Sequence, residues 1–145
     1  MSAGRISATS LVHGEGEGLL LRLDAPISFW GGVDPATGRI QSPRHPQYGE
    51  TIGGRVLAIP RLIGSSSSSA VLLELIAAGR GPAALILGGV DAILLIAPVV
   101  GRELGLAAPP AVDLAPEAIA RLPEARLRVV AQREGAAEIR VLGER

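Results

Sequence analysis

A glycine followed by five serines, residues 64–69, is the segment of this sequence whose residue types could most directly do chemistry. An apolar stretch ends at Pro60 just before it, and apolar residues with helical spacing begin at Val71 just after it. A strand and a helix so close in the chain must pack on each other, whereas flexible serine-rich linkers join parts that need not touch. The run is therefore predicted to be a strand–loop–helix junction, with the helix starting near Ser68 or Ser69.

The start of a helix presents unpaired backbone N–H groups and a partial positive charge, which together favour a bound anion. Helix capping needs one serine, so it does not explain the other hydroxyls. Gly64 allows a ligand to approach the backbone closely, and the hydroxyls of Ser65 to Ser67 add donors and acceptors. The segment is therefore predicted to bind a small carboxylate or phosphate.

A serine hydroxyl in this position could also move a proton. A free hydroxyl is far too weak a base near neutral pH, so it needs help from its surroundings. A positive charge nearby would stabilise the alkoxide, and Arg39, Arg44 and Arg61 are the candidates.

Periodicity and turn residues predict the elements that position this junction. Residues 14–18, with three glycines, are predicted to form a turn, and residues 40–52, with two prolines, an ordered loop. The predicted strands are 5–12, 18–23, 27–31, 55–60, 83–87, 111–112, 126–131 and 137–142. The predicted helices run from near residue 68 to Gly79, from Asp91 into the low 100s with a kink or break at Pro98, and from Pro116 to Leu122. Two layers of strands with helices on one side would bury this pattern, and residues 1–145 are predicted to form one domain.

Composition and charge exclude several classes of function. The 14 basic residues, all arginine, balance 14 acidic residues, so no net charge favours nucleic acid or an anionic membrane surface. The chain has no cysteine and two histidines, so it offers no thiolate for an iron–sulfur cluster and a metal site within it is not expected. The first residues lack the apolar core of a signal peptide, and the longest apolar stretch, 92–100, is too short to span a bilayer. We expect a cytoplasmic protein.

Three segments together resemble the small-subunit domain of aconitase X: ISFWGGVDPATGRI at 27–40, HPQYGETIGGRVLAIP at 45–60 and GSSSSSAVLLE at 64–74. The resemblance covers about half of the chain and rests on the order of these pieces. It implies a mixed α/β fold, a swivelling β/β/α domain similar to the mobile fourth domain of aconitase. It also implies the small subunit of a hydro-lyase, inactive without a large subunit that carries an iron–sulfur cluster on its own cysteines. This chain would bind no cofactor itself.

The same resemblance implies a catalytic residue. In aconitase-type domains the serine directly after the glycine of this loop takes the substrate proton, which in this sequence is Ser65, and the repeated serines leave Ser66 as the second candidate. Aconitase has an arginine two residues beyond that serine, where this chain has Ser67. The charge of the substrate must then be met by backbone N–H groups, hydroxyls or arginines from elsewhere. The residues expected to bind a small anionic substrate are Gly64, Ser66, Ser67, His45 and Arg39.

Members of the family dehydrate cis-3-hydroxy-L-proline in bacteria or mevalonate 5-phosphate in archaea. The serine run and the arginine-rich composition favour the bacterial substrate, with mevalonate 5-phosphate as the alternative. A different class also stays open, namely a non-catalytic module that closes over an anion, or a phosphate carrier that uses His45. His45 could equally be a loop residue that only holds its turn.

Other side chains admit both structural and functional interpretations. Trp30, followed by two glycines, could lie in the core or contact a partner, and we expect the contact surface. Asp34 is expected to cap its turn through the side chain. Glu15, Glu17 and His13 are expected to be solvated.

Overall fold

The computed structural model describes residues 4–144 of the chain, which form seven strands and four helices. In chain order these are β1 (Arg5–Val12), β2 (Gly14–Arg22), α1 (Phe29–Gly32), β3 (Val56–Ile59), α2 (Ser68–Ala77), β4 (Ala84–Leu87), α3 (Ala92–Glu103), β5 (Ala111–Asp113), α4 (Pro116–Ala120), β6 (Ala125–Ala131) and β7 (Ala136–Glu144). None of the helices in this part of the chain is long and apolar enough to cross a membrane.

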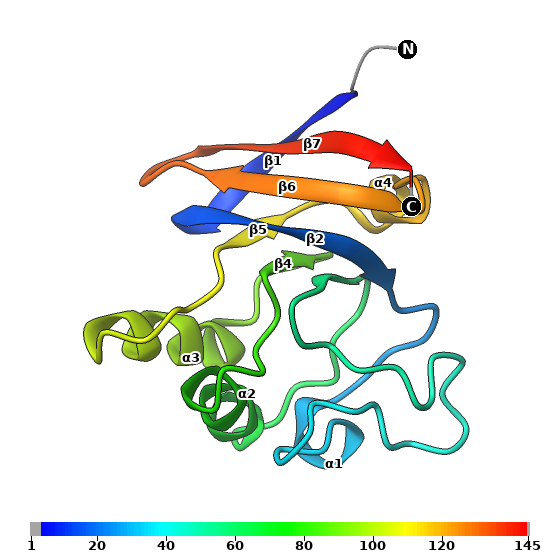
Figure 1. Ribbon diagram of the computed structural model, residues 1–145, viewed down its shortest axis with the longest axis vertical. Coiled ribbons are helices and arrows are strands. Elements are labelled where there is room, and N and C mark those ends of the chain that lie inside the picture. Colours follow the sequence, from blue (N-terminus) through cyan, green and yellow to red (C-terminus); the bar gives the residue numbers. More distant parts are fainter. Residues whose placement is uncertain (1–3, 145) are drawn as a thin grey trace.

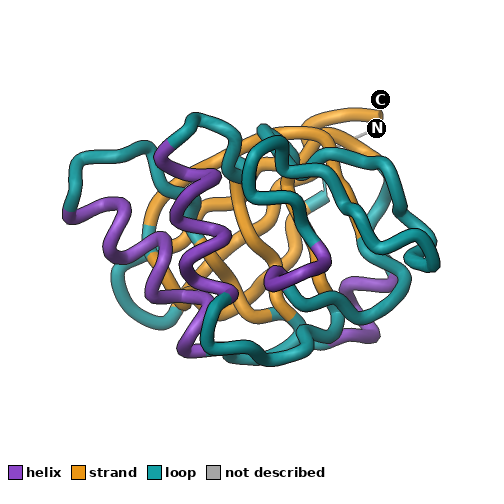
Figure 2. The backbone as a smooth tube through the Cα atoms, turned by 90° about the horizontal axis from the view of Figure 1, so that it is seen from below, coloured by secondary structure: helices purple, strands orange, loops and turns teal. Residues whose placement is uncertain are grey.

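The strands form a closed barrel in the order β1-β5-β4-β3-β2-β6-β7. Neighbours from β2 through β3 and β4 to β5 are parallel, and the remaining pairs are antiparallel. The two expected strand layers are thus opposite sides of one barrel (Figure 1). Helices α2 and α3 and the long loops lie over one side of the strands (Figure 2). The mixed α/β class is therefore confirmed.

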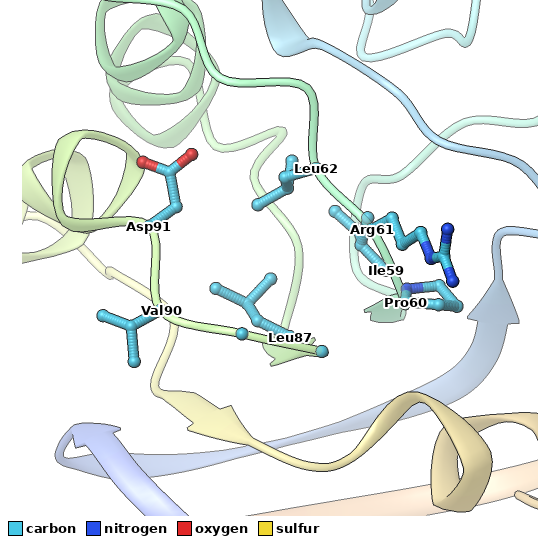
Figure 3. Close-up of a pocket in the computed structure, with 9 residues that line it drawn as sticks. Ile59, Pro60, Arg61, Leu62, Leu87, Val90 and Asp91 are labelled. Atoms are coloured by element: carbon cyan, nitrogen blue, oxygen red, sulfur yellow. The ribbon is translucent and has the colours of Figure 1, made fainter.

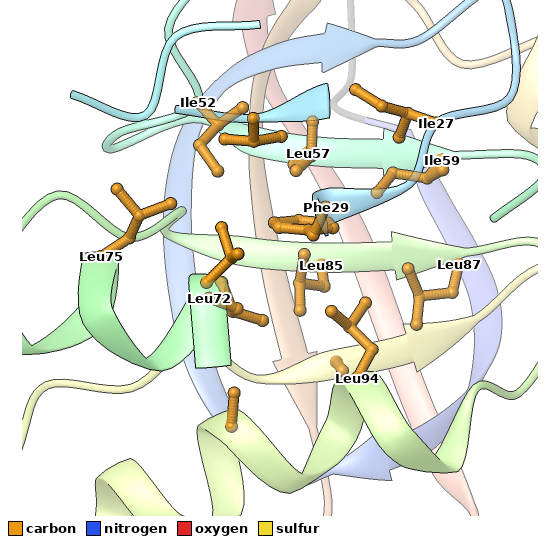
Figure 4. Packing of buried hydrophobic residues seen from close by; sticks show 14 of the residues in the cluster. Ile27, Phe29, Ile52, Leu57, Ile59, Leu72, Leu75, Leu85, Leu87 and Leu94 are labelled. Carbon is orange, nitrogen blue, oxygen red and sulfur yellow. The ribbon is translucent and has the colours of Figure 1, made fainter. Parts of the chain in front are cut away.

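The β3 and β4 strands are apolar throughout because both of their faces are buried. Val56 and Ala58 point into the barrel core, while Leu57 and Ile59 belong to a second core under the helices. Parallel strands covered on both faces have this continuous apolar pattern. The second core, under the helices, also contains the buried Phe29 (Figure 4).

The glycine-rich residues 14–18 are strand, so the predicted turn is wrong. They belong to β2, where they pair with β6. A side chain at Gly16 or Gly18 would overlap the backbone carbonyl oxygen of Ala83 or Gly54. Glycine is needed there for close backbone approach, and not for a turn.

The strand predicted for residues 27–31 is also wrong. The backbone makes one isolated bridge, between Ile27 and Leu62, and then turns through α1. Gly31 has φ of 82°, a left-handed conformation that ends any extended run. Phe29 is turned into the core and Trp30 outward, where 64% of its surface is exposed. Trp30 therefore lies outside the core, and its expected contact with a partner stays a prediction.

The predictions for the start of α3 at Asp91 and the end of α2 at Gly79 are confirmed. The carboxylate of Asp91 accepts from the backbone N–H groups of Ile93 and Leu94 and so caps α3. Gly79 follows α2 with φ of 73°. Of the two expected effects of Pro98, the break is absent, since α3 runs from Ala92 to Glu103 without interruption, and the kink stays a prediction.

The polar side chains of residues 13–17 meet the expectation in part. Glu15 and Glu17 are exposed, as expected, and their carboxylates also form ion pairs across the sheet to Arg128 of β6, at 3.1 Å and 3.2 Å. His13 is half-buried, with its Nδ1 2.9 Å from the guanidinium of Arg102.

Candidate functional site

The candidate site lies along one edge of the barrel, where the four parallel strands end. The loops that leave this edge are residues 23–28 after β2, 60–67 after β3 and 88–91 after β4. In parallel sheets, ligands bind outside the carboxyl ends of the strands. The serine run is part of the second of these loops.

Two adjoining clefts open at this edge. One has a volume of about 350 Å³ and separates the end of β3 from the end of β4, with residues 59–62 on one side and residues 87–91 on the other (Figure 3). The other lies between residues 23–26 and Pro60 with Arg61. Arg61 lines both clefts, and its exposed guanidinium has no ion pair or hydrogen bond within the described part of the chain.

The approach of the two loops in the first cleft depends on Gly88. A Cβ on Gly88 would overlap the carbonyl oxygen of Pro60, and the Gly88 N–H donates to the carbonyl of Ile59 at 2.9 Å. In the sequence the Gly88–Gly89 pair signals only the end of a strand. The second role of Gly88, which is to allow the ends of β3 and β4 to approach closely, depends on Pro60, which is distant in the chain.

The serine loop forms the start of α2. The helix begins at Ser68 as predicted, and Ser67 precedes it without making a side-chain cap. The Oγ of Ser65 accepts from the Ser67 N–H at 3.3 Å, and the Ser65 carbonyl accepts from the Ser68 N–H at 3.2 Å. Ser65 therefore supplies the hydroxyl oxygen that accepts from the backbone N–H of Ser67, just before the helix begins.

The five serines differ in exposure. Ser66 is exposed, and Ser65, Ser67 and Ser69 are half-buried. Ser68 is buried, and its Oγ has no hydrogen-bond partner within residues 4–144. Gly64 is exposed, with open space where a Cβ would lie. Gly64 and Ser65 to Ser67 therefore stay together as one accessible group, whereas the hydroxyl of Ser68 is withdrawn.

His45 lies near this group but is fully engaged. It is buried, and it lines a small cleft together with Ile63, the residue before Gly64. Its Nδ1 accepts from the Gln47 N–H at 3.0 Å, so Nε2 carries the proton that it donates to the carbonyl of Ala25, also at 3.0 Å. With both nitrogens bonded, His45 holds loop 40–52 against the segment after β2, and neither nitrogen is free to carry a phosphate.

Arg39 lies apart from the serine loop. A Cβ on the preceding Gly38 would lie 3.6 Å from Leu75 and 3.5 Å from the carbonyl oxygen of Arg80, near the end of α2. The ten residues of α2 span about 15 Å, and the serines are at its other end. The guanidinium of Arg39 instead stacks over Tyr48, 4.9 Å from the ring centroid.

No group of three or more metal-ligating side chains occurs within residues 4–144. The chain as a whole contains no cysteine. The residues present therefore do not fit an iron–sulfur cluster, and any such cluster of the working protein would have to be bound by another part.

Comparison with known proteins identifies the domain. Residues 5–139 match the family model of the aconitase X swivel domain. The chain belongs to the aconitase X swivel domain family. A crystal structure of aconitase X from Thermococcus kodakaraensis in its holo form has the same fold, with a TM-score of 0.80 and 29% identity over 94% of this chain and 98% of that chain. The expected swivelling β/β/α domain is thereby confirmed.

Two relatives of this swivel domain carry different names. A cis-3-hydroxy-L-proline dehydratase of Pseudomonas aeruginosa is 46% identical over 95 residues, which make up 66% of this chain and 16% of that relative. A phosphomevalonate dehydratase small subunit of Pyrococcus furiosus is 38% identical over 96 residues, 66% of this chain and 72% of the relative. The chain thus spans only a minor part of the first relative and most of the second.

Proposed function

We propose that this chain is the small, swivelling part of an aconitase X-type dehydratase and that Ser65, as its alkoxide, accepts the proton removed from a hydroxy acid. The supporting observation is the position of Ser65. Its Oγ is at the start of α2, on the edge where the parallel strands end, and accepts a backbone N–H from Ser67. The aconitase X swivel family supplies the reaction class, because its named relatives are dehydratases.

The proposed step is an elimination. Ser65 first loses its hydroxyl proton to solvent and reacts as the alkoxide. The C–H bond beside the substrate carboxylate then breaks, and its proton forms the new O–H bond of Ser65, which later returns that proton to solvent. The electron pair of that C–H bond becomes the second bond of a C=C, and the hydroxyl group on the next carbon leaves with its own electron pair. The proton and the hydroxide together account for one water.

This chain's residues lower the barrier through electrostatics. Negative charge on the Ser65 oxygen is stabilised by the Ser67 N–H and by the positive end of the α2 dipole, which has no acidic residue in its first turn. Arg61 is in the same loop, four residues before Ser65, has no ion pair within residues 4–144, and would attract a substrate carboxylate to this edge.

The other half of the active site is proposed to come from a large subunit, or from a large part of the same protein. It would carry the iron–sulfur cluster, which in such enzymes acts as a Lewis acid. On this proposal the chain alone is inactive. The substrate is proposed to be cis-3-hydroxy-L-proline, with mevalonate 5-phosphate as the second candidate, because relatives of both kinds are similar to this chain.

A non-catalytic anion-binding module is the competing function. The open serine loop at a helix start favours anion binding in either case. The phosphate-carrier version has less support, because both ring nitrogens of His45 are bonded.

The test is co-expression of this chain with the large aconitase X-type subunit of the same genome, followed by dehydration assays on both substrates. Water loss from one substrate, dependent on both parts, supports the proposal. A complex that binds either anion but releases no product supports the anion-binding module instead.

A further inference from the structure

One face of α3 is unusually apolar for a helix on a protein surface. Ile93, Ile96 and Val99 are 41%, 51% and 50% exposed, and Val90, just before the helix, is 64% exposed. Residues three apart lie about 60° apart around a helix axis, so the three helical positions share one face. We name Val90, Ile93, Ile96 and Val99 the α3 strip.

The α3 strip is not the face that anchors the helix. Leu94, Ala97 and Gly101 point the other way and are buried, and Gly101 lies against Ile76 of α2. A helix fixed by one apolar face normally has polar side chains on the opposite one. On α3 the opposite face instead carries the branched apolar side chains of Ile93, Ile96 and Val99.

Helix α2 provides a comparison within the same molecule. It packs beside α3, and its exposed positions are Ala70, Glu74 and Ala77, which are small or charged. The two helices share one side of the barrel, so solvent alone does not explain why one of them exposes large apolar side chains. Exposed apolar patches of this kind mark interaction surfaces.

The α3 strip starts at the candidate site. Val90 lines the cleft between the ends of β3 and β4, beside Asp91 (Figure 3). Ile63, directly before Gly64, is also large, apolar and 54% exposed. Ile63 and Val90 thus belong to the two loops, 60–67 and 88–91, that leave the same edge of the barrel and face each other across this cleft.

We infer that the α3 strip is the surface on which the large part of the dehydratase docks. The inference rests on the proposed function. Two observations favour this occupant over a second copy of the chain. The strip is continuous with a site that is open on one side, and the matched segment is only 16% of the hydroxyproline dehydratase relative, so that relative contains much further chain for such a surface to contact. The strip has no charged side chain, as expected for the centre of an interface.

The experiment measures binding of the tagged large subunit from the same genome to the full chain, using the Ile96→Lys/Val99→Lys double variant. Both side chains are solvent-exposed, so lysine should leave the fold intact, which circular dichroism and thermal unfolding check. The expected result is weaker binding by about tenfold or more for each residue. Ala77→Lys places the same charge on the exposed face of α2 and should change affinity less than twofold. Val90→Gln, outside the helix, is a second probe of the strip and should also weaken binding.

The outcomes separate this inference from the catalytic proposal. Equal binding by the wild-type chain and the strip variants overturns the docking surface even if the complex is active. If the wild-type chain binds the large subunit and the strip variants do not, the docking surface is supported. That holds even if the complex dehydrates neither substrate, because such inactivity would remove only the catalytic proposal. Concentration-dependent dimers of the chain alone, abolished by the double variant, would assign the strip to self-association and overturn the inference.

Discussion

The Oγ of Ser65 and the backbone N–H of Ser67 are 3.3 Å apart and hydrogen-bonded, with the hydroxyl oxygen as acceptor. This bond holds the Ser65 oxygen at the positive end of α2 and leaves its own proton available to another acceptor. One of five chemically identical side chains is thereby given a distinct environment.

Replacing Ser65 by alanine is expected to lower turnover by about 10²–10⁴-fold, the usual contribution of a positioned acid–base group, while binding of the large part is retained. The measurement is the rate of dehydration by the assembled protein at saturating substrate. Ser66→Ala is the comparison, because Ser66 is the second candidate and has no hydrogen bond within the described chain, so the Ser65 variant should lose more activity. Near-normal turnover by the Ser65 variant would remove its catalytic assignment.

His45→Ala is expected to lower the free energy of unfolding by about 1–3 kcal/mol, because the half-buried partners Ala25 and Gln47 lose their hydrogen bonds to the ring nitrogens. Chemical denaturation measures this loss, and hydrogen exchange should show faster opening of loop 40–52. Arg44→Ala, on the exposed neighbouring residue, serves as the control. Unchanged stability together with lost activity would instead favour direct contact between His45 and the substrate.

Gly88→Ala is expected to destabilise the protein by about 1–3 kcal/mol, because its methyl group would overlap the carbonyl oxygen of Pro60 and force apart the ends of β3 and β4. Thermal or denaturant unfolding measures the change. Gly64→Ala is the comparison, since its methyl group would meet open space and should cost little stability. If both variants have wild-type stability, the close approach at the cleft is not a constraint on the fold.

The pKa of His13 is lowered below its usual 6.5 by burial first, then by the positive charges of Arg102 and Arg133. The folded protein therefore holds this proton less tightly than the unfolded chain. Stability from the neutral imidazole is present above the unfolded pKa and is lost as pH falls through the lower folded value.

Arg102→Gln is accordingly expected to raise the pKa of His13 toward 6.5 and to weaken the loss of stability in acid. Titration of the His13 ring protons by NMR measures the shift. Arg133→Gln should produce a smaller rise. An unchanged His13 pKa in the Arg102 variant would show that the guanidinium does not control it.

Local features of the structure follow from short stretches of sequence. The cap at Asp91, the stop at Gly79 and the start of α4 at Pro116 each depend on a few neighbouring residues, and each was predicted. The glycines at 14–18 were misassigned because a turn and a crowded strand both require a residue without a side chain. What distinguishes the two is the carbonyls of Ala83 and Gly54, which are distant in sequence.

The amino-acid sequence by itself determined the family, the mixed α/β class and the position of the serines at a helix start, because these depend on local propensity and on the order of motifs. The tertiary structure decided which hydroxyls are accessible, that both nitrogens of His45 are bonded, and that Arg39 is at the wrong end of α2. It also left the apolar face of α3 uncovered. Burial and hydrogen bonding depend on which segments meet in space, and that contact is made only when the barrel closes.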